Sequence, residues 1–294
     1  KIEEHVPLGQ YTTFRLGATC AGMIHCQTPQ QLEETIPYLA KEKKKIILIG
    51  GGSNIVVSDE PLDCYVVRYC ADRPIVEQNG TVLTVSGSTK LDHLVLFAAQ
   101  RGLEGVNYAT GIPGTVGGAI VGNAGAWGKQ IGDVLTSVDL ISPAGVKKTA
   151  GAQHLQFTYR DSILKKTGDI VVSAVLSLQR GDAKALLEER EKILAERRSK
   201  HPDLRYEPCA GSFFRNIEPT SKAGKRQAAG WFLEEAGGKK LKVGGAVIFQ
   251  KHANIIVKSE GCRAQDVYEL SLQMTRLVKE KFNLDLVREV RFVG

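Results

Sequence analysis

The chain has 294 residues, of which 43% are hydrophobic, and it carries a net charge of +7. This length predicts two or three compact units with buried cores. No apolar run approaches the ~20 residues of a membrane helix, and Lys1 opens no charged-then-apolar leader, so a soluble chain without an export signal is expected. Because "EEREKILAERRSK" mixes acids with bases, we expect solvated helix faces that attract small anions rather than a nucleic-acid surface.

The first half of the chain predicts a mixture of helices and strands. Thr28-Pro29 is typical of a helix N-terminus, and the apolar run Ile46–Ile49 predicts a strand. Residues 75–86 predict two short strands joined at Asn79-Gly80, a strong hairpin turn signal. Apolar residues at helical spacing then predict a helix that stops at Gly102.

Two segments are rich in glycine. "GGGSN" comprises residues 50–54, and "GIPGTVGGAIVGNAGAWG" at 111–128 has seven glycines. Glycine permits positive φ and lets another molecule touch the backbone, so the segments predict either tight turns or loops whose amides bind a phosphate or pyrophosphate. Neither segment matches the Rossmann fingerprint or the P-loop pattern, so those two nucleotide sites are not indicated.

The later part of the chain predicts a separate unit. Strand-like sequence at 138–150 and 169–180 runs into the polar stretch 180–185, where we place a boundary. The elements expected beyond it are a helix ending before Pro202, a short helix at 227–237, an amphipathic helix through 267–278 and a strand at 286–294.

The six cysteines predict reduced thiols rather than disulfides. They form no C-x-x-C pair and have no metal-ligand spacing with histidine. We interpret them as small core residues of a cytosolic chain, and no bound metal is expected.

Six motifs in one order resemble a known family, the UDP-N-acetylenolpyruvoylglucosamine reductases, which are FAD enzymes of peptidoglycan precursor synthesis. The motifs are "GGGSN", the 111–128 segment, "YRDS" at 159–162, "GSFFRN" at 211–216, "KHAN" at 251–254 and "EVRF" at 289–292. They span nearly the whole chain. Each motif alone would be weak evidence, whereas the ordered set is specific.

The resemblance implies an α+β fold: a two-part FAD-binding domain of the vanillyl-alcohol oxidase type, followed by a smaller α+β substrate-binding domain. We expect the FAD-binding subdomains at 1–70 and 71–180 and the substrate-binding domain at 181–294. The resemblance also implies a monomeric, cytoplasmic enzyme of cell-wall biogenesis, acting in cell shape and cell division, without nucleic-acid or membrane partners.

The implied reaction has two halves. NADPH reduces FAD and leaves, and UDP-N-acetylglucosamine enolpyruvate then takes hydride on its vinyl carbon. Protonation of the resulting carbanion yields UDP-N-acetylmuramate. The implied FAD-binding positions are Gly50, Gly51, Gly52, Ser53, Asn54, Gly111, Ile112, Pro113, Gly114, Thr115, Gly117, Gly118, Ala119, Asn123 and Gly125.

Three residues are implied to be catalytic. Arg160 matches the arginine placed against the enolpyruvyl carboxylate, where a guanidinium stabilises charge that spreads into an enolate. Ser212 matches the proton donor, although an alcohol is a weak acid and Cys209 is more reactive. Glu289 matches the glutamate near the double bond. Without the resemblance, the preferred interpretation of Arg160 is a surface partner of Asp161, and the alternative for Glu289 is an edge-strand charge.

The remaining substrate contacts are implied for Lys200 and Asn216, near the nucleotide diphosphate, and for Tyr159 and Asn254. The chain departs from the long form of the family, which has an insertion after "YRDS" with a tyrosine that closes over substrate. Only 39 residues separate Arg160 from Lys200, and one helix fills most of them. The resemblance is therefore to the shorter subclass.

Two other classes remain open. An FAD-linked oxidase on the same fold would explain the glycine segments but not the set Arg160, Ser212 and Glu289. A non-catalytic nucleotide-binding or nucleic-acid-binding protein is suggested by charge alone, and it predicts a colourless protein.

Overall fold

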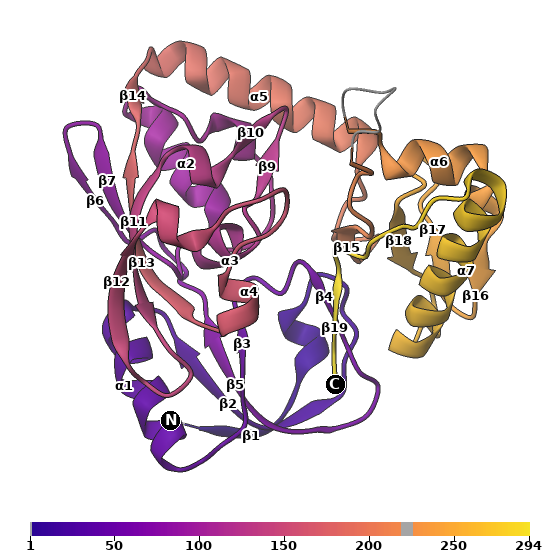
Figure 1. The fold of residues 1–294 in the computed structure, drawn as a ribbon, viewed down its shortest axis with the longest axis horizontal. Coiled ribbons are helices and arrows are strands. Elements are labelled where there is room, and N and C mark those ends of the chain that lie inside the picture. Colours follow the sequence, from indigo (N-terminus) through magenta and orange to yellow (C-terminus); the bar gives the residue numbers. More distant parts are fainter. Residues whose placement is uncertain (1, 219–225) are drawn as a thin grey trace. The chain divides into compact units, whose positions relative to one another are not determined.

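The computed structural model describes residues 2–218 and 226–294, and the chain forms two compact units (Figure 1). Unit 1 comprises Lys1–Val6, Cys20–Gly51 and Asp63–Arg197. Unit 2 comprises Pro7–Thr19, Gly52–Leu62 and Arg198–Gly294. The ranges expected from the sequence are continuous, whereas each unit is assembled from several segments of the chain.

Unit 1 contains a four-stranded sheet of order β1-β2-β5-β3. Its strands are β1 (Glu3–Pro7), β2 (Thr19–Cys26), β5 (Leu62–Tyr69) and β3 (Ile46–Ile49). Helix α1 (Pro29–Lys41) joins β2 to β3, which pairs in parallel with β5. The predicted start of α1 is confirmed, because the Thr28 hydroxyl accepts a hydrogen bond from the Gln31 amide at 3.3 Å.

A second, antiparallel sheet of unit 1 has the order β12-β11-β13-β7-β6. Its strands are β12 (Lys147–Gly151), β11 (Leu135–Ile141), β13 (Ile170–Ser177), β7 (Val82–Ser86) and β6 (Val76–Asn79). The predicted hairpin is confirmed: β6 and β7 are joined through Gly80, which has φ +62°. Helix α2 (Leu91–Gln100) follows and ends before Gly102, also as predicted.

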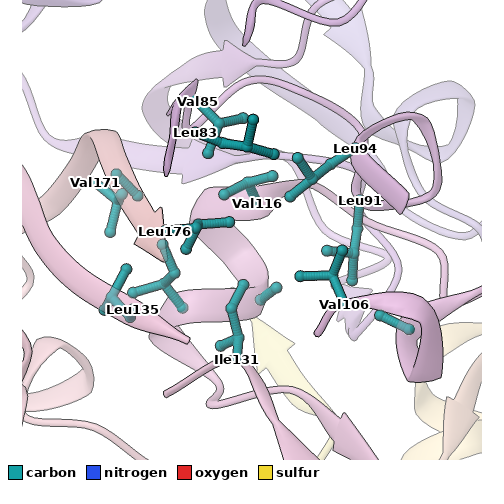
Figure 2. Packing of buried hydrophobic residues seen from close by; sticks show 14 of the residues in the cluster. Leu83, Val85, Leu91, Leu94, Val106, Val116, Ile131, Leu135, Val171 and Leu176 are labelled. Carbon is teal, nitrogen blue, oxygen red and sulfur yellow. The ribbon is translucent and has the colours of Figure 1, made fainter. Parts of the chain in front are cut away.

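The 111–128 segment is more than a loop. It contains helix α3 (Val116–Val121), which starts at Thr115. Figure 2 shows Val116 among Leu83 and Val85 of β7, Leu176 of β13 and Leu94 of α2. Burying this helix in the main core of unit 1 anchors the middle of the segment, so the glycines on either side of α3 have fixed positions.

Several shorter elements complete unit 1. They are β8 (Leu103–Glu104), β9 (Gly125–Ala126), β10 (Lys129–Gln130), β14 (Gln179–Arg180), α4 (Leu164–Thr167), η2 (Asn107–Ala109), η3 (Ile131–Asp133) and η4 (Ala152–Leu155). The helix expected before Pro202 is α5 (Ala183–Lys200), and unit 1 includes it as far as Arg197.

Unit 2 has a four-stranded antiparallel sheet of order β15-β18-β17-β16. Its elements are β15 (Cys209–Ser212), β18 (Ile255–Lys258), β17 (Ala246–Ile248), β16 (Lys242–Val243), α6 (Ala229–Glu235), α7 (Ala264–Phe282), η1 (Leu8–Tyr11) and η5 (Gly238–Lys240). Helices α6 and α7 confirm the two predicted helices. The final strand is shorter than predicted: β19 (Arg291–Val293) pairs in parallel with β4 (Ile55–Val57).

Two general features bear on the chemistry. All six cysteines are free thiols, as predicted, and five of them are buried. Across residues 2–218 and 226–294, no helix combines the length and apolar character needed to cross a bilayer.

Candidate active site

The two glycine segments contact each other within unit 1. A Cβ atom added to Gly51 would lie 2.7 Å from Gly114 Cα, and one added to Gly50 would lie 2.5 Å from Thr115 Oγ1. The main chain around Gly114 is held by a hydrogen bond from the Leu91 amide to the Gly114 carbonyl at 3.0 Å. The two segments therefore pack closely against each other, and Gly50 and Gly51 must lack side chains for this packing.

The loop 50–54 continues into unit 2 from Gly52. This glycine has φ +62°, and a Cβ there would lie 2.0 Å from the Tyr11 carbonyl oxygen. Gly52 therefore requires the absence of a side chain for packing inside its own unit, independently of any ligand. Asn54, two residues later, bonds through Nδ2 to the Glu289 carbonyl at 3.1 Å, while the Arg291 amide bonds to the Asn54 carbonyl at 3.1 Å.

Arg197 is a candidate cofactor residue that the sequence did not indicate. Its side chain lies against Gly111, because a Cβ on Gly111 would be 3.0 Å from Arg197 Cδ, and its guanidinium lies 5.7 Å from the Trp127 ring centre. The buried Nε atom has no hydrogen-bond acceptor among the described residues, and burial lowers the pKa of Arg197. A half-buried cation beside the glycine segment fits an anionic group such as a phosphate.

The interpretation of "EEREKILAERRSK" as a solvated face is wrong for Arg190, which is 8% exposed. Arg190 donates two hydrogen bonds of 2.7 Å to the two carboxylate oxygens of Asp92, and Asp92 also accepts from the Gly111 amide at 2.8 Å. Charge patterning could not reveal this, because the partner lies 98 residues away in α2. Asp92 therefore connects helix α5 to the first residue of the glycine segment.

Replacing Asp92 with asparagine is expected to destabilise the protein at neutral pH but not in acid. Burial opposes the charge of Asp92, yet the hydrogen bonds from Arg190 and Gly111 outweigh it and hold the pKa of this carboxyl below its ordinary value. Its contribution is thus present above the unfolded pKa of about 4 and is lost as the pH falls through the folded pKa.

Urea unfolding at pH 7 and pH 3 measures this effect. Because Asp92 is partly exposed, we expect a difference of about 2 kcal/mol at pH 7, below the ~3–5 kcal/mol of a fully buried pair. The difference should shrink towards pH 3. The control is Asp285→Asn, which removes the exposed Lys279–Asp285 pair and should change stability by less than about 1 kcal/mol at either pH. An equal Asp92→Asn effect at both pH values would contradict the ionic role.

Arg160 occupies a tight turn in unit 1. Thr158 and Asp161 exchange two backbone hydrogen bonds of 3.2 Å around Tyr159 and Arg160, and Arg160 has φ +57°, a conformation that a residue with a side chain rarely adopts. Its Nη2 atom donates to the Gly125 carbonyl at 2.6 Å, and Asp161 lies 3.6 Å from Lys165 Nζ. An unusual backbone conformation held by its surroundings is common at functional sites.

Asn123 is the centre of the hydrogen bonds around this turn. It is fully buried, and its Nδ2 atom donates to the Thr158 carbonyl and to Gln130 Oε1, each at 2.9 Å. Its Oδ1 atom accepts from the Gly132 amide at 3.2 Å. The structure therefore brings together the expected residues Asn123, Gly125 and Arg160 within unit 1.

Ser212 ends strand β15 in unit 2. Gly211 has φ +75°, a Cβ added to it would meet no atom within 4 Å, and the pairing of β15 with β18 shifts register between Cys209 and Ser212. Such a bulge changes the direction of the strand at the residue that follows it. Burial raises the pKa of the Cys209 thiol, so Cys209 is a poorer proton donor than its unperturbed chemistry suggested.

Three motifs of unit 2 meet at the main chain after Ser212. The Phe213 carbonyl accepts from the Glu289 amide at 2.9 Å, and the Phe213 amide donates to the Asn254 carbonyl at 2.7 Å. The Asn254 side chain bonds to both polar backbone atoms of Phe214: its Oδ1 accepts from the amide at 2.9 Å, and its Nδ2 donates to the carbonyl at 2.8 Å. "GSFFRN", "KHAN" and "EVRF" are thus held as one cluster.

The other expected substrate residues are dispersed. Lys200 is exposed at the end of α5, and Asn216 is exposed while its Oδ1 accepts from the Ala229 amide at 3.2 Å. Tyr159 lies beside the Arg160 guanidinium, with 5.1 Å from the ring centre to Cζ. Arg215, which the sequence did not single out, has a buried Nε atom without an acceptor among residues 2–218 and 226–294.

Comparison with known proteins defines the class first. A model of the FAD binding domain matches residues 20–151, so the chain is an FAD-binding protein. A model of the UDP-N-acetylenolpyruvoylglucosamine reductase C-terminal domain matches residues 202–293. The chain belongs to the UDP-N-acetylenolpyruvoylglucosamine reductase family.

Full-length relatives support this assignment. The reductase of Lactobacillus acidophilus is 33% identical over 293 residues, covering 100% of this chain and 95% of the relative. The Bacillus licheniformis reductase is 34% identical over 301 residues, covering 100% and 94%. The crystal structure of the Thermus caldophilus reductase superposes with a TM-score of 0.81 at 30% identity, covering 100% of this chain and 99% of that one. The expected α+β fold and the shorter subclass agree with these matches, and the oxidase alternative gains no support.

Proposed function

We propose that this chain reduces UDP-N-acetylglucosamine enolpyruvate to UDP-N-acetylmuramate with NADPH, in peptidoglycan precursor synthesis. The observation that carries the proposal is the end-to-end similarity to reductases of this name, together with the Ser212–Asn254–Glu289 cluster. When bound, FAD carries hydride from NADPH to the methylene carbon of the enol ether. The reaction takes place in the cytoplasm, where NADPH and nucleotide sugars are available, and the enzyme acts as a monomer.

FAD is proposed to bind along the two glycine segments, where the main chain carries few side chains, and beside the half-buried side chain of Arg197. Gly50, Gly51 and Gly111–Ala119 supply a main-chain surface, anchored by the burial of Val116. Arg197 supplies positive charge beside Gly111 for the pyrophosphate. The contribution of Gly52–Asn54 is partly indirect, because this segment also holds Glu289.

Arg160 is proposed to bind the substrate carboxylate. Addition of hydride to the methylene carbon moves an electron pair to the adjacent carbon, and the charge spreads onto the carboxylate attached there. A guanidinium held in a fixed turn stabilises that charge without reorganising during the reaction. Lys200, Asn216 and Tyr159 are proposed to bind the rest of the sugar nucleotide, Lys200 through charge attraction to its diphosphate.

Ser212 is proposed to donate the proton that completes the product. The Ser212 hydroxyl bond to hydrogen breaks as the new C–H bond forms, and the alkoxide is reprotonated from solvent or through a neighbouring acid. Glu289 is suited to that second task, because its backbone is bonded to the residue after Ser212. The bulge at Gly211 and the hydrogen bonds on Phe213 and Phe214 hold the backbone that carries the Ser212 hydroxyl.

The visible spectrum of the purified protein, followed anaerobically, tests this function. NADPH should bleach the flavin absorbance, and UDP-N-acetylglucosamine enolpyruvate should restore it. Recovery only on admission of oxygen would indicate an oxidase. A colourless protein that cannot be reconstituted with FAD would contradict the proposal.

Replacing Glu289 with glutamine is expected to slow the recovery of absorbance by about tenfold or more while leaving bleaching by NADPH within about twofold. The amide keeps the size of the side chain and the backbone bonds to Phe213 and Asn54, so the change isolates the carboxyl group. Rapid-mixing absorbance at saturating substrate measures both steps. Normal recovery would remove Glu289 from the proton path.

A further inference from the structure

The two buried asparagines that the resemblance assigned to ligands have their carboxamides committed to the protein. Asn123 is 0% exposed and Asn254 is 2% exposed. Both donors of Asn123 Nδ2 are used, on Thr158 and Gln130, and its Oδ1 accepts from Gly132. The Asn254 amide bonds at both ends to Phe214. Each carboxamide is thus buried and already bonded to the main chain at both its nitrogen and its oxygen, which favours a structural role over contact with FAD or substrate.

Each of these asparagines bonds to the main chain next to a proposed catalytic residue. Asn123 bonds to the Thr158 carbonyl, which begins the turn that contains Arg160. Asn254 bonds to Phe214, two residues after Ser212. Asn54 Nδ2 bonds in the same manner to the carbonyl of Glu289, although Asn54 is exposed.

A physical need for such bonds is visible at both places. Arg160 has a positive φ in a tight turn, and Gly211 beside Ser212 has a positive φ within a register shift, so regular strand pairing is interrupted at both places. An asparagine side chain has the donor and acceptor of a peptide group, so it can bond to main-chain groups that the interrupted pairing leaves over. At Phe214 it satisfies the backbone N–H and C=O together.

We propose that Asn254 and Asn123 are positioning residues for Ser212 and Arg160 respectively, and that neither contacts a ligand. The inference rests on the proposed roles of Ser212 and Arg160. For Asn254, the proposal predicts that a mutation lowers the rate of the proton-delivering step and leaves substrate affinity nearly unchanged. A displacement of about 1 Å at a reacting group can reduce a rate by about 100-fold.

Asn254→Ala tests the first half of the proposal. At saturating UDP-N-acetylglucosamine enolpyruvate, the rate constant for recovery of flavin absorbance should fall about 10-fold to 100-fold. The substrate concentration for half-maximal rate should change less than about threefold, and bleaching by NADPH should be unchanged. In the protein without cofactor, hydrogen exchange at the Phe214 amide should accelerate, because its acceptor is removed.

The matched control is Asp266→Ala in the same unit. Asp266 is 5% exposed and also binds the main chain, accepting from the Gly245 and Arg263 amides at 3.2 and 3.0 Å, but at the start of α7. It should lower stability without altering either flavin step. If Asn254→Ala does not fold, Asn254→Asp, which keeps an acceptor for the Phe214 amide but loses the donor, takes its place.

Two results would overturn the proposal for Asn254. A raised half-saturating substrate concentration with an unchanged maximal rate would identify a ligand contact, and unchanged kinetics would remove Asn254 from the site altogether. An error in the proposed function itself would be seen in different experiments. The unmodified protein would then fail to show flavin bleaching and recovery, or Ser212→Ala would recover its flavin absorbance at the normal rate.

Asn123→Ala tests the second half. Because Asn123 positions Arg160, which is proposed to stabilise charge that develops during the reaction, the rate constant for recovery of flavin absorbance at saturating substrate should fall about tenfold or more, while the FAD dissociation constant, measured by flavin fluorescence, changes less than about threefold. The control in unit 1 is Asp169→Asn, which breaks the 2.7 Å ion pair between Asp169, just before β13, and Lys148 of β12. Weaker FAD binding with normal substrate kinetics would show that Asn123 contacts the cofactor and would overturn the proposal.

Discussion

Replacing Ser212 with alanine is expected to slow reoxidation of the flavin by the enolpyruvyl substrate at least about 100-fold while leaving its reduction by NADPH nearly intact. Only the second half of the reaction needs a proton from the protein, so the loss should be confined to that half. Rapid-mixing absorbance with each substrate in turn measures the two rates. Equal losses in both halves would contradict the role of Ser212 as proton donor.

The matched control for this variant is Cys209→Ala. Cys209 is three residues earlier in the same strand and carries the more acidic group in water, but it is buried and its pKa is raised. Its replacement should lower stability through the lost packing and leave both half-reactions within about twofold. A selective loss of reoxidation in Cys209→Ala would transfer the proton-donor role to the thiol.

Replacing Gly51 with valine is expected to abolish tight FAD binding. The new Cβ would lie 2.7 Å from Gly114 Cα, and the other nearest atoms are also backbone, so no side chain can rotate away. The two glycine segments must separate, which costs about 1–3 kcal/mol or more and disturbs the surface proposed for the cofactor. The flavin content after purification and the FAD dissociation constant measure the effect, which should be a loss of at least about tenfold in affinity.

Gly80→Ala is the control for backbone effects alone. Gly80 has φ +62° in the hairpin of unit 1, and nothing lies within 4 Å of an added Cβ. This variant should lose about 1 kcal/mol of stability from its backbone conformation while retaining FAD. If Gly51→Val binds FAD as tightly as Gly80→Ala does, the contact between the two glycine segments is not part of the cofactor site.

Local sequence signals predicted several helices and turns, because these depend on interactions within a few residues. Thr28-Pro29 specifies a helix start through bonds within four residues, and Asn79-Gly80 specifies a hairpin through the φ that glycine permits. The burial of α3 was missed, because its glycines are typical of loops and only the surrounding core makes the helix stable.

The candidate site divides in the same way. The order of the motifs was sufficient to indicate the family, FAD and the three proposed catalytic residues. The bond from Arg190 to Asp92 was not foreseeable, since an arginine among alternating charges is normally solvated and its partner lies in another helix. The two hydrogen bonds from the Asn254 side chain to Phe214 were not foreseeable either, because nothing in the sequence indicates that this polar side chain is only 2% exposed.

By itself, the sequence determined the local elements and the identity of the chemical groups, since these depend on residue type and on neighbours a few positions away. Only the tertiary structure decided which side chains bond to the main chain of each motif. For example, β4 pairs with β19 from the other end of the chain, and this pairing brings Asn54 within hydrogen-bond distance of the Glu289 carbonyl. Such contacts depend on the packing of segments that are far apart in the chain, which local residue patterns do not specify.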